Sequence, residues 1–334
     1  MTDEAALLSL PPYGLGRAEK RAFLAAELSA LTANHAARCP AYAKMLAALG
    51  VALDAPMALE AVPFLPVRAF KEFSLKSVPD AEVFKTLTSS GTTGQQVSRI
   101  YLDRATAALQ NKVLAKIMES TLGSARLPMI VIDSPSVVKD RATFSARGAG
   151  ILGFSIFGRD RIYALTDSMQ LDVDGLDAFL SKHEGEPIFL FGFTYIVWRH
   201  FYAELVRLGY RPDLRRGVLV HGGGWKKLAD QAVSRERFRE ALREACGIRQ
   251  VLDYYGMAEQ TGAIYVECEH GHLHAPAWSD VLIRRPSDFS VADTGETGLI
   301  EVVSVLARSY PGHALLTEDE GRLLGEDDCP CGRK

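Results

Sequence analysis

Apolar residues in the first part of the chain recur every three to four positions, which is the spacing of an amphipathic helix. The pattern is clearest over residues 18–35, where we expect a long helix. A shorter helix is expected over residues 39–49. Pro63 and Pro66 then favour an extended connector. Residues 1–80 are therefore predicted to form a helical N-terminal region.

The middle of the chain alternates short apolar runs with helical patterns. Runs that are apolar nearly throughout, as is typical of strands covered on both faces, lie at 128–133, 187–191 and 217–221. Helical patterns lie at 104–119, 195–208 and 228–245. This alternation predicts an α/β core with a largely parallel sheet over residues 81–250. Ligands of such sheets bind beyond the carboxyl ends of the strands.

Helical spacing fades after residue 250. Strand-like runs follow at 250–255, 263–267, 281–283 and 299–303. Residues 251–334 are therefore expected to form a small β-rich subdomain.

Composition and charge narrow the function classes. With 334 residues and 48% hydrophobic residues, the chain has enough apolar surface for a substantial core. The net charge of -3 provides no basic field, so we expect small molecules or proteins rather than nucleic acid as partners. No apolar run reaches the roughly 18 residues of a membrane span, and the start lacks the basic region of a signal peptide. The expected location is the cytoplasm.

A hydroxyl- and glycine-rich stretch precedes the predicted core. Its members are Thr88, Ser89, Ser90, Gly91, Thr92, Thr93 and Gly94. Glycine lets the backbone approach an anion closely and the hydroxyls add donors, so the stretch suits a polyphosphate. A flexible, solvated turn is the alternative. The stretch lacks the Gly-Lys-Ser/Thr ending of a P-loop, which argues against a kinase or GTPase of that class.

Two further candidates stand where predicted strands end. The run at 217–221 is followed by Gly222, Gly223 and Gly224. The run at 250–255 ends at Tyr255 and Gly256, and Glu259 lies three residues further on. The tyrosine ring could stack on a base and the carboxylate could hold a divalent cation against phosphate oxygens. A buried tyrosine and a surface glutamate are the alternative.

The acidic segment 315–322 is predicted to be a turn. Asp319 within it could accept hydrogen bonds from ribose hydroxyls. A merely solvated turn is the more common explanation of such a pattern.

The five cysteines are an odd number, which argues against a disulfide framework. Cys268, Cys329 and Cys331, with His274 as the imidazole, would supply the Cys₃His set of a structural zinc site. Two alternatives stay open: reduced thiols in a loose tail, and a thiolate that carries an acyl group.

Taken in order, the clusters at 88–94, 255–259 and 317–319 resemble the nucleotide motifs of the adenylate-forming enzymes, which activate carboxylates as acyl-AMP. Ala258 and Glu318 depart from the usual threonine and glycine of those motifs. The stretches at 39–42, 63–73 and 268–278 resemble, more narrowly, the acyl-protein synthetase family typified by the bacterial luminescence fatty-acid ligase component. The phenylacetate-CoA ligases are the next relatives. The resemblance spans residues 36–334.

This resemblance implies a fold and a set of residue roles. The fold is the α/β large N-terminal domain of an adenylate-forming enzyme, ending at a hinge, with the mobile C-terminal domain expected to be absent after Lys334. The implied phosphate contacts are Thr88, Ser89, Ser90, Gly91, Thr92, Thr93 and Gly94. The implied adenine contacts are Gly222, Gly223, Gly224, Tyr255 and Gly256. Glu259 would coordinate Mg²⁺ and Asp319 the ribose, and Lys226 and Arg333 are further candidates for anion contacts.

The implied function is the ATP-dependent activation of a fatty or aryl acid to acyl-AMP, followed by transfer to the thiol of a protein, a carrier or CoA. A reductase or transferase is the expected protein partner. Phe191, Phe193 and Trp225 would either line an apolar acyl pocket or belong to the core. Two rival functions stay open: a CoA ligase like the phenylacetate enzymes, and a non-catalytic subunit that binds nucleotide or acyl groups.

Overall fold

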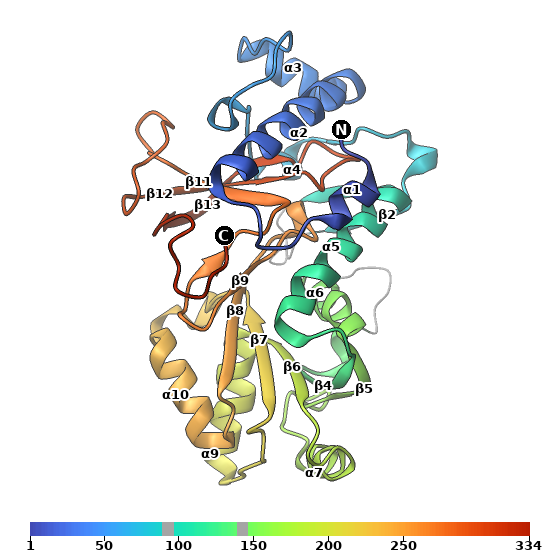
Figure 1. Ribbon diagram of the computed structural model, residues 1–334. Helices are drawn as coiled ribbons and strands as arrows, with labels where there is room; N and C mark the ends of the chain where they lie inside the picture. Colours follow the sequence, from blue (N-terminus) through green and yellow to red (C-terminus); the bar gives the residue numbers. More distant parts are fainter. Residues whose placement is uncertain (89–96, 139–145) are drawn as a thin grey trace. The chain divides into compact units, whose positions relative to one another are not determined.

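The computed structural model describes residues 1–88, 97–138 and 146–334 (Figure 1). The chain divides into two compact units. The first comprises residues 1–120, 256–265 and 274–334, and the second comprises residues 121–255 and 266–273. The three consecutive regions expected from the sequence stay a prediction, because these units follow spatial contacts rather than chain order.

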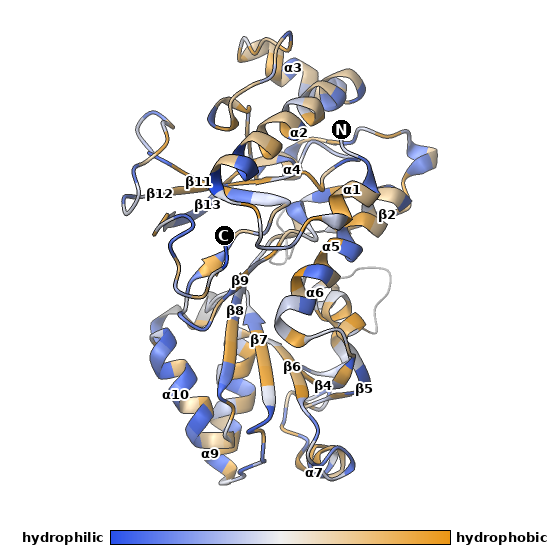
Figure 2. Ribbon diagram, in the orientation of Figure 1, coloured by the Kyte–Doolittle hydropathy of each residue, from blue (hydrophilic) through white to orange (hydrophobic). Residues whose placement is uncertain are grey.

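A parallel sheet forms the core of the second unit. Its strands β8, β7, β6, β4 and β5 are neighbours in that order and run parallel, and β9 and β10 continue the sheet beyond β8. The strands are β4 (Leu127–Ile132), β5 (Gly158–Tyr163), β6 (Ile188–Phe193), β7 (Gly217–Gly222), β8 (Gln250–Tyr255), β9 (Tyr265–Glu267) and β10 (Leu273–His274). The three apolar runs are thus strands β4, β6 and β7, as predicted. Figure 2 shows hydrophobic colouring along these strands.

Helices cover both faces of this sheet. They are α6 (Ala146–Phe154), α7 (Val173–Lys182), α8 (Thr194–Ile196), the π-helical segment η5 (Val197–Tyr202), α9 (Ala203–Leu208) and α10 (Arg235–Cys246), with 3₁₀ turns η3 (Pro135–Val138), η4 (Ser155–Phe157) and η6 (Lys226–Gln231). The Phe154 ring of α6 stacks on Phe191 with ring centroids 4.3 Å apart. The Phe238 ring of α10 lies 4.7 Å from the ring of His221. Successive side chains along a strand point to opposite faces of the sheet. Because helices cover both faces here, both sets of side chains are buried, which explains the nearly continuous apolar runs.

Two helix predictions need correction. The helix expected at 195–208 contains the π-helical segment η5, which periodicity alone does not reveal. The helix expected at 228–245 begins only at Arg235, because Ser234 caps it: the Ser234 hydroxyl accepts the backbone N–H of Arg237 at 3.2 Å.

The first unit begins with the predicted helices and also contains two smaller sheets. Its helical elements are α1 (Glu4–Ser9), α2 (Arg17–Arg38), α3 (Pro40–Ala48), η1 (Leu59–Ala61), α4 (Ala69–Glu72), η2 (Asp80–Glu82), α5 (Arg104–Leu122) and η7 (Ala258–Gln260). One sheet has the order β1 (Leu65–Pro66), β13 (Ala314–Arg322), β12 (Thr297–Ser304) and β11 (Ser279–Arg284), and the other pairs β2 (Lys85–Thr88) with β3 (Arg99–Leu102). Within residues 1–88, 97–138 and 146–334, no helix has the length and apolar character that crossing a bilayer requires.

The prediction of an acidic turn at 315–322 is wrong, because these residues belong to strand β13, which pairs with β12. The strand is irregular, however. Leu299 pairs with Glu320 and Glu301 pairs with Leu316, so residues 317–319 of β13 lie opposite Ile300 alone. The charged residues of the segment occupy this bulge and the exposed end of the strand, which explains why their pattern resembles a turn.

Candidate functional site

The glycines after β7 lie at the carboxyl edge of the parallel sheet. Gly222 pairs with Tyr254 of β8, and a side chain at Gly222 would place its Cβ 2.7 Å from the Tyr254 carbonyl oxygen. Gly223 has a φ of +81°, and its Cβ would lie 2.7 Å from the Phe193 ring. Only glycine fits this stretch without a shift. The edge therefore presents bare backbone next to the end of β8.

The two tyrosines that end β8 point to opposite faces of the sheet. Tyr254 packs against Phe154 with ring centroids 5.0 Å apart, and burial raises the pKa of Tyr254. Tyr255 is half-buried and, by strand alternation, lies on the other face, which α10 covers. The sequence assigned the stacking role to Tyr255, and the structure places that residue one position beyond the Gly222–Tyr254 pair.

A buried histidine lies beneath this edge. Thr194 donates from its hydroxyl to the Gly222 carbonyl oxygen at 3.1 Å, so its oxygen accepts from Nδ1 of His221 at 2.9 Å. Burial lowers the pKa of His221 to about 3, which keeps the ring neutral at pH 7. The Oδ1 atom of Asp253 lies 3.8 Å from the same Nδ1. Burial, followed by the charge of Glu267, raises the pKa of Asp253 to about 7.

The aromatic residues proposed for an acyl pocket fall into two clusters. Phe191 and Phe193 lie 5.8 Å apart by ring centroids, in the cluster that includes Phe154. Trp225 instead packs edge-on against Trp198 at 5.6 Å. Since Phe191 is fully buried, it belongs to the core.

Glu259 is positioned from within the first unit. It lies in the 3₁₀ turn η7 and is 6% exposed, so the alternative of a surface glutamate is excluded. Its carbonyl oxygen accepts the Tyr310 hydroxyl at 2.8 Å. The side chain of the next residue, Gln260, donates to the carbonyl oxygens of Val302 at 3.0 Å and Gly312 at 2.9 Å. The turn that carries the carboxylate is therefore fixed to the segments around 302 and 312.

Asp319 lies on the bulge of β13 and is exposed. The Thr317 hydroxyl donates to the Ile300 carbonyl oxygen at 2.8 Å, and its oxygen lies 3.2 Å from the Asp319 backbone nitrogen, which donates to it. This local arrangement holds the backbone of Asp319 at the irregular part of the strand.

The hydroxyl- and glycine-rich stretch predicted to bind phosphate is described only at its start. Thr88 ends β2 and pairs with Arg99 of β3 in an antiparallel arrangement. The remaining candidates, Ser89, Ser90, Gly91, Thr92, Thr93 and Gly94, lie outside the described residues. Lys226 is the first residue of η6, and the Arg333 guanidinium lies 4.5 Å from the centre of the Tyr13 ring.

Three of the candidate zinc ligands come together in the first unit. The ligand atoms of His274, Cys329 and Cys331 lie within 4.8 Å of one another, and Nε2 of His274 is 3.4 Å from the Cys331 sulfur. Gly332, with a φ of +78°, donates its N–H to the Cys329 carbonyl oxygen at 3.0 Å and closes the turn between the two cysteines. Cys268 is buried in the segment 266–273 of the second unit, six residues before His274.

Sequence reasoning missed the residues that support these candidates. Tyr310 and Gln260 hold the Glu259 turn, while Thr194 and His221 hold the Gly222 edge. The only signal for them is a polar or hydroxyl side chain inside an otherwise apolar segment, such as His221 at the end of its run.

Comparison with known proteins places the chain among acyl-activating enzymes. A model of the family described as acyl-protein synthetase, LuxE, matches residues 2–334. The long-chain-fatty-acid–luciferin-component ligase of Vibrio harveyi is 25% identical over 288 residues, which cover 80% of this chain and 71% of that protein. The ligase of the same name from Aliivibrio fischeri is 23% identical over 290 residues, which cover 79% of this chain and 69% of that protein.

Solved structures of 2-hydroxyisobutyryl-CoA ligase have the same fold. The open conformation in complex with 2-HIB-AMP and CoA gives a TM-score of 0.75 at 18% identity and covers 100% of this chain and 78% of that one. The postadenylation state with 2-HIB-AMP gives a TM-score of 0.75 at 16% identity and covers 100% of this chain and 70% of that one. The expected α/β fold of the adenylate-forming enzymes is thereby confirmed. Because the family model matches almost the whole sequence, the chain belongs to the acyl-protein synthetase family.

Proposed function

We propose that this chain uses ATP to activate a carboxylic acid as acyl-AMP and then transfers the acyl group to a thiol. In the first step a carboxylate oxygen attacks the α-phosphorus, the bond from that phosphorus to the bridging oxygen breaks, and pyrophosphate leaves. In the second step a thiolate attacks the acyl carbonyl, and AMP leaves with the electron pair of the C–O bond. Family membership supports this chemistry.

The observation that carries the proposal is the bare backbone edge at Gly222–Gly224 beside the end of β8. Gly222 is held against Tyr254, and Tyr255 follows on the face toward α10. The exposed peptide groups of Gly223 and Gly224 and an aromatic ring are both surfaces on which a flat base can stack. In the proposal Tyr255 and Gly256 contact the adenine, and Asp319 the ribose.

The phosphates would be bound by residues 88–94, Thr92 among them, with Lys226 and Arg333 as additional anion contacts. Glu259 would hold Mg²⁺, which supplies charge neutralisation at the phosphates when bound. A buried carboxylate on a fixed turn suits this hard cation, since Mg²⁺ prefers oxygen ligands in strict geometry. The chain's own contribution is positioning: the Tyr310 hydroxyl and the Gln260 amide fix the turn before substrate arrives.

The names of the curated relatives suggest the substrate and the acceptor. Both relatives are ligases for a long-chain fatty acid and a luciferin component, so we propose a fatty acid as substrate and a protein thiol as acceptor, with a reductase or transferase as partner in the cytoplasm. The solved relatives bind CoA, which keeps a CoA ligase as the second candidate. Product analysis separates the two, because release of acyl-CoA at a useful rate with CoA present would favour the CoA ligase.

The Cys/His cluster is proposed to bind structural Zn²⁺. Thiolates and a neutral imidazole are the ligands that zinc prefers, and His274, Cys329 and Cys331 already lie within ligating reach of a shared ion. Cys268 is proposed as the fourth ligand because a structural zinc site is tetrahedral and Cys268 supplies a further thiol six residues before His274. Its backbone N–H donates to the His272 carbonyl oxygen at 2.9 Å. One zinc per chain, lost in a Cys329→Ser/Cys331→Ser variant, is the expected result of metal analysis. Zinc-free wild-type protein would leave the acyl-thiol role as the better explanation.

Pyrophosphate exchange with a panel of carboxylic acids tests the activation step. Exchange should depend on the acid and should fall about 100-fold or more in Glu259→Gln, since the variant lacks the carboxylate that would hold the charge-neutralising Mg²⁺. Glu119→Gln is the matched control, because Glu119 is an exposed glutamate of α5. Equal exchange in the two variants would refute the role of Glu259. Nucleotide binding without exchange for any acid would instead indicate a non-catalytic subunit.

A further inference from the structure

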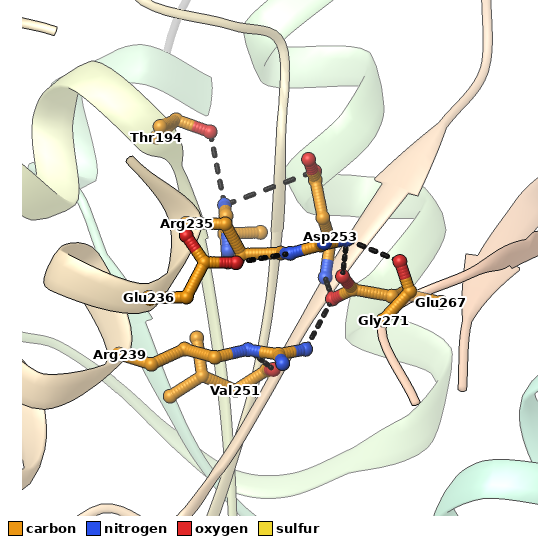
Figure 3. Close-up of polar contacts among 9 residues, drawn as sticks. Thr194, Arg235, Glu236, Arg239, Val251, Asp253, Glu267 and Gly271 are labelled. Atoms are coloured by element: carbon orange, nitrogen blue, oxygen red, sulfur yellow. Dashed lines mark hydrogen bonds and ion pairs between the residues drawn. The ribbon is translucent and has the colours of Figure 1, made fainter. Parts of the chain in front are cut away.

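The side of β8 that faces β9 is held by side chains as well as by the neighbouring strand. The Val251 carbonyl oxygen accepts from Nε of Arg239 at 3.1 Å, and the Asp253 N–H donates to Oε2 of Glu267 at 2.9 Å (Figure 3). These two main-chain groups are two residues apart and so project from the same edge of the strand. The opposite edge pairs with β7 as far as Tyr254. Both edges of β8 are therefore fixed close to Tyr255.

Glu267 is the centre of this arrangement. Its side chain is 2% exposed, and its carboxylate accepts from Nη1 of Arg235 at 2.8 Å and from Nη2 of Arg239 at 2.6 Å. Arg235 also donates to the Gly271 carbonyl oxygen in the turn after β9. A buried carboxylate is costly unless it is fully paired, and here two guanidinium groups and one backbone N–H satisfy it. We call Arg235, Arg239 and Glu267 the β8 clamp.

The β8 clamp joins three elements at one place. Arg235 and Arg239 lie in the first turns of α10, Glu267 ends β9, and the groups they hold belong to β8. The last clamped group, the Asp253 N–H, precedes Tyr255 by two residues. Loss of the clamp would release the Val251 carbonyl oxygen and the Asp253 N–H on the β9 side of the strand, while the β7 side stayed paired. We therefore expect the orientation of Tyr255 to change without unfolding of the strand.

We propose that Glu267 is a positioning residue that, through the β8 clamp, holds Tyr255 at the angle needed to stack on the base of the nucleotide. This inference rests on the proposed function only in taking that nucleotide to be ATP. Glu267 does not contact the substrate in this proposal; it acts through the Asp253 backbone.

Glu267→Gln tests the proposal because it keeps the side-chain shape but turns an amide NH₂ toward guanidinium donors. We expect the Kd and KM for ATP to rise on the order of tenfold, with kcat for exchange changed by less than threefold, since a tilted ring weakens ground-state binding of the base. Arg239→Lys should act in the same direction, because lysine lacks the separate Nε and Nη2 donors with which Arg239 reaches Val251 and Glu267. A purely structural ion cluster would lower Tm and leave the KM for ATP unchanged.

Glu236→Gln is the matched control. Glu236 lies 3.5 Å from Nε of the same Arg235, but its side chain is 75% exposed, and among the described residues it makes no hydrogen bond to β8. The Glu236→Gln variant should leave the Kd for ATP unaltered. Amide hydrogen exchange gives a readout without turnover: the Asp253 amide should exchange faster in both clamp variants and at the wild-type rate in the control.

Direct ATP titration separates failure of this inference from failure of the proposed function. If wild-type protein exchanges pyrophosphate but Glu267→Gln and Arg239→Lys keep its Kd for ATP, the inference fails and the function stands. If wild-type protein binds ATP without exchange for any acid, the function fails, and the Kd ratio of the variants still decides the inference. Wild-type protein that does not bind ATP would overturn both.

Discussion

Replacing Tyr310 with phenylalanine removes one hydroxyl from the buried support of Glu259. The Tyr310 side chain is fully buried, and its hydroxyl donates to the Glu259 carbonyl oxygen at 2.8 Å. Its ring packs edge-on against Phe70 with centroids 6.0 Å apart, and phenylalanine keeps this contact. Tyr310→Phe therefore deletes this hydrogen bond, and a longer one that the hydroxyl accepts from Nε2 of Gln110 at 3.5 Å, and leaves the packing in place.

The expected loss follows from the burial of this hydrogen bond. A carbonyl oxygen left without its donor in a buried site costs about 1–3 kcal/mol. With an unfolding entropy of about 2.1 cal/mol/K per residue, this cost lowers the Tm of a chain of this size by about 1–4 °C. Because the oxygen belongs to Glu259 itself, the carboxylate turn also loosens. We expect kcat for pyrophosphate exchange to fall on the order of tenfold.

Thermal unfolding and exchange at saturating ATP measure the two effects. Tyr163→Phe is the matched control, because within the described part of the chain the buried Tyr163 hydroxyl has no hydrogen-bond partner. It should lose neither stability nor activity. If the Tyr310→Phe and Tyr163→Phe proteins have the same Tm and the same exchange rate, the Tyr310 hydroxyl does not support Glu259 and the reasoning is refuted.

Two further predictions concern the glycine edge and acid stability. Gly222→Ala should raise the KM for ATP more than tenfold, because the added Cβ would lie 2.7 Å from the Tyr254 carbonyl oxygen and displace the glycine edge. Gly153→Ala is the control: no atom lies within 4 Å of its added Cβ, so the KM for ATP should stay unchanged. Burial lowers the pKa of His35 to about 4, so the unfolded chain binds a proton more readily than the folded chain. The free energy of unfolding should therefore fall by about 3 kcal/mol as pH drops from 6.5 to 4. His35→Gln should flatten that slope in denaturant titrations at pH 7 and pH 4.5, and an unchanged slope would exclude His35 as its source.

The parts of the fold that could be predicted are those that local pattern determines. Strands β4, β6 and β7 are buried on both faces, so their sequences are apolar nearly throughout and can be recognised without the structure. Strand β13 was mistaken for a turn because its bulge at 317–319 carries charged residues to the surface. Strand β5 (Gly158–Tyr163) was missed for a similar reason: Arg159, Asp160 and Arg161 leave no alternating pattern at this edge of the sheet.

The motif residues of the candidate site could be predicted from the sequence, but the residues that hold them in place could not. Tyr255, Gly256 and Glu259 stand in one short segment and could be found together. Tyr310 supports Glu259 from 51 residues further along the chain, and only the folded packing brings the two together. Glu267 looked like an ordinary strand residue, and its pairing with Arg235 and Arg239 depends on the placement of α10 against β9.

The most direct test of the central claim is acid-dependent exchange of labelled pyrophosphate into ATP by the purified protein, measured with a panel of short-chain, long-chain and aryl carboxylic acids. The account predicts that exchange requires an acid, that a long-chain fatty acid gives the highest rate, and that Glu259→Gln abolishes most of it. Tight ATP binding with no exchange for any acid, with and without a thiol acceptor, would contradict it.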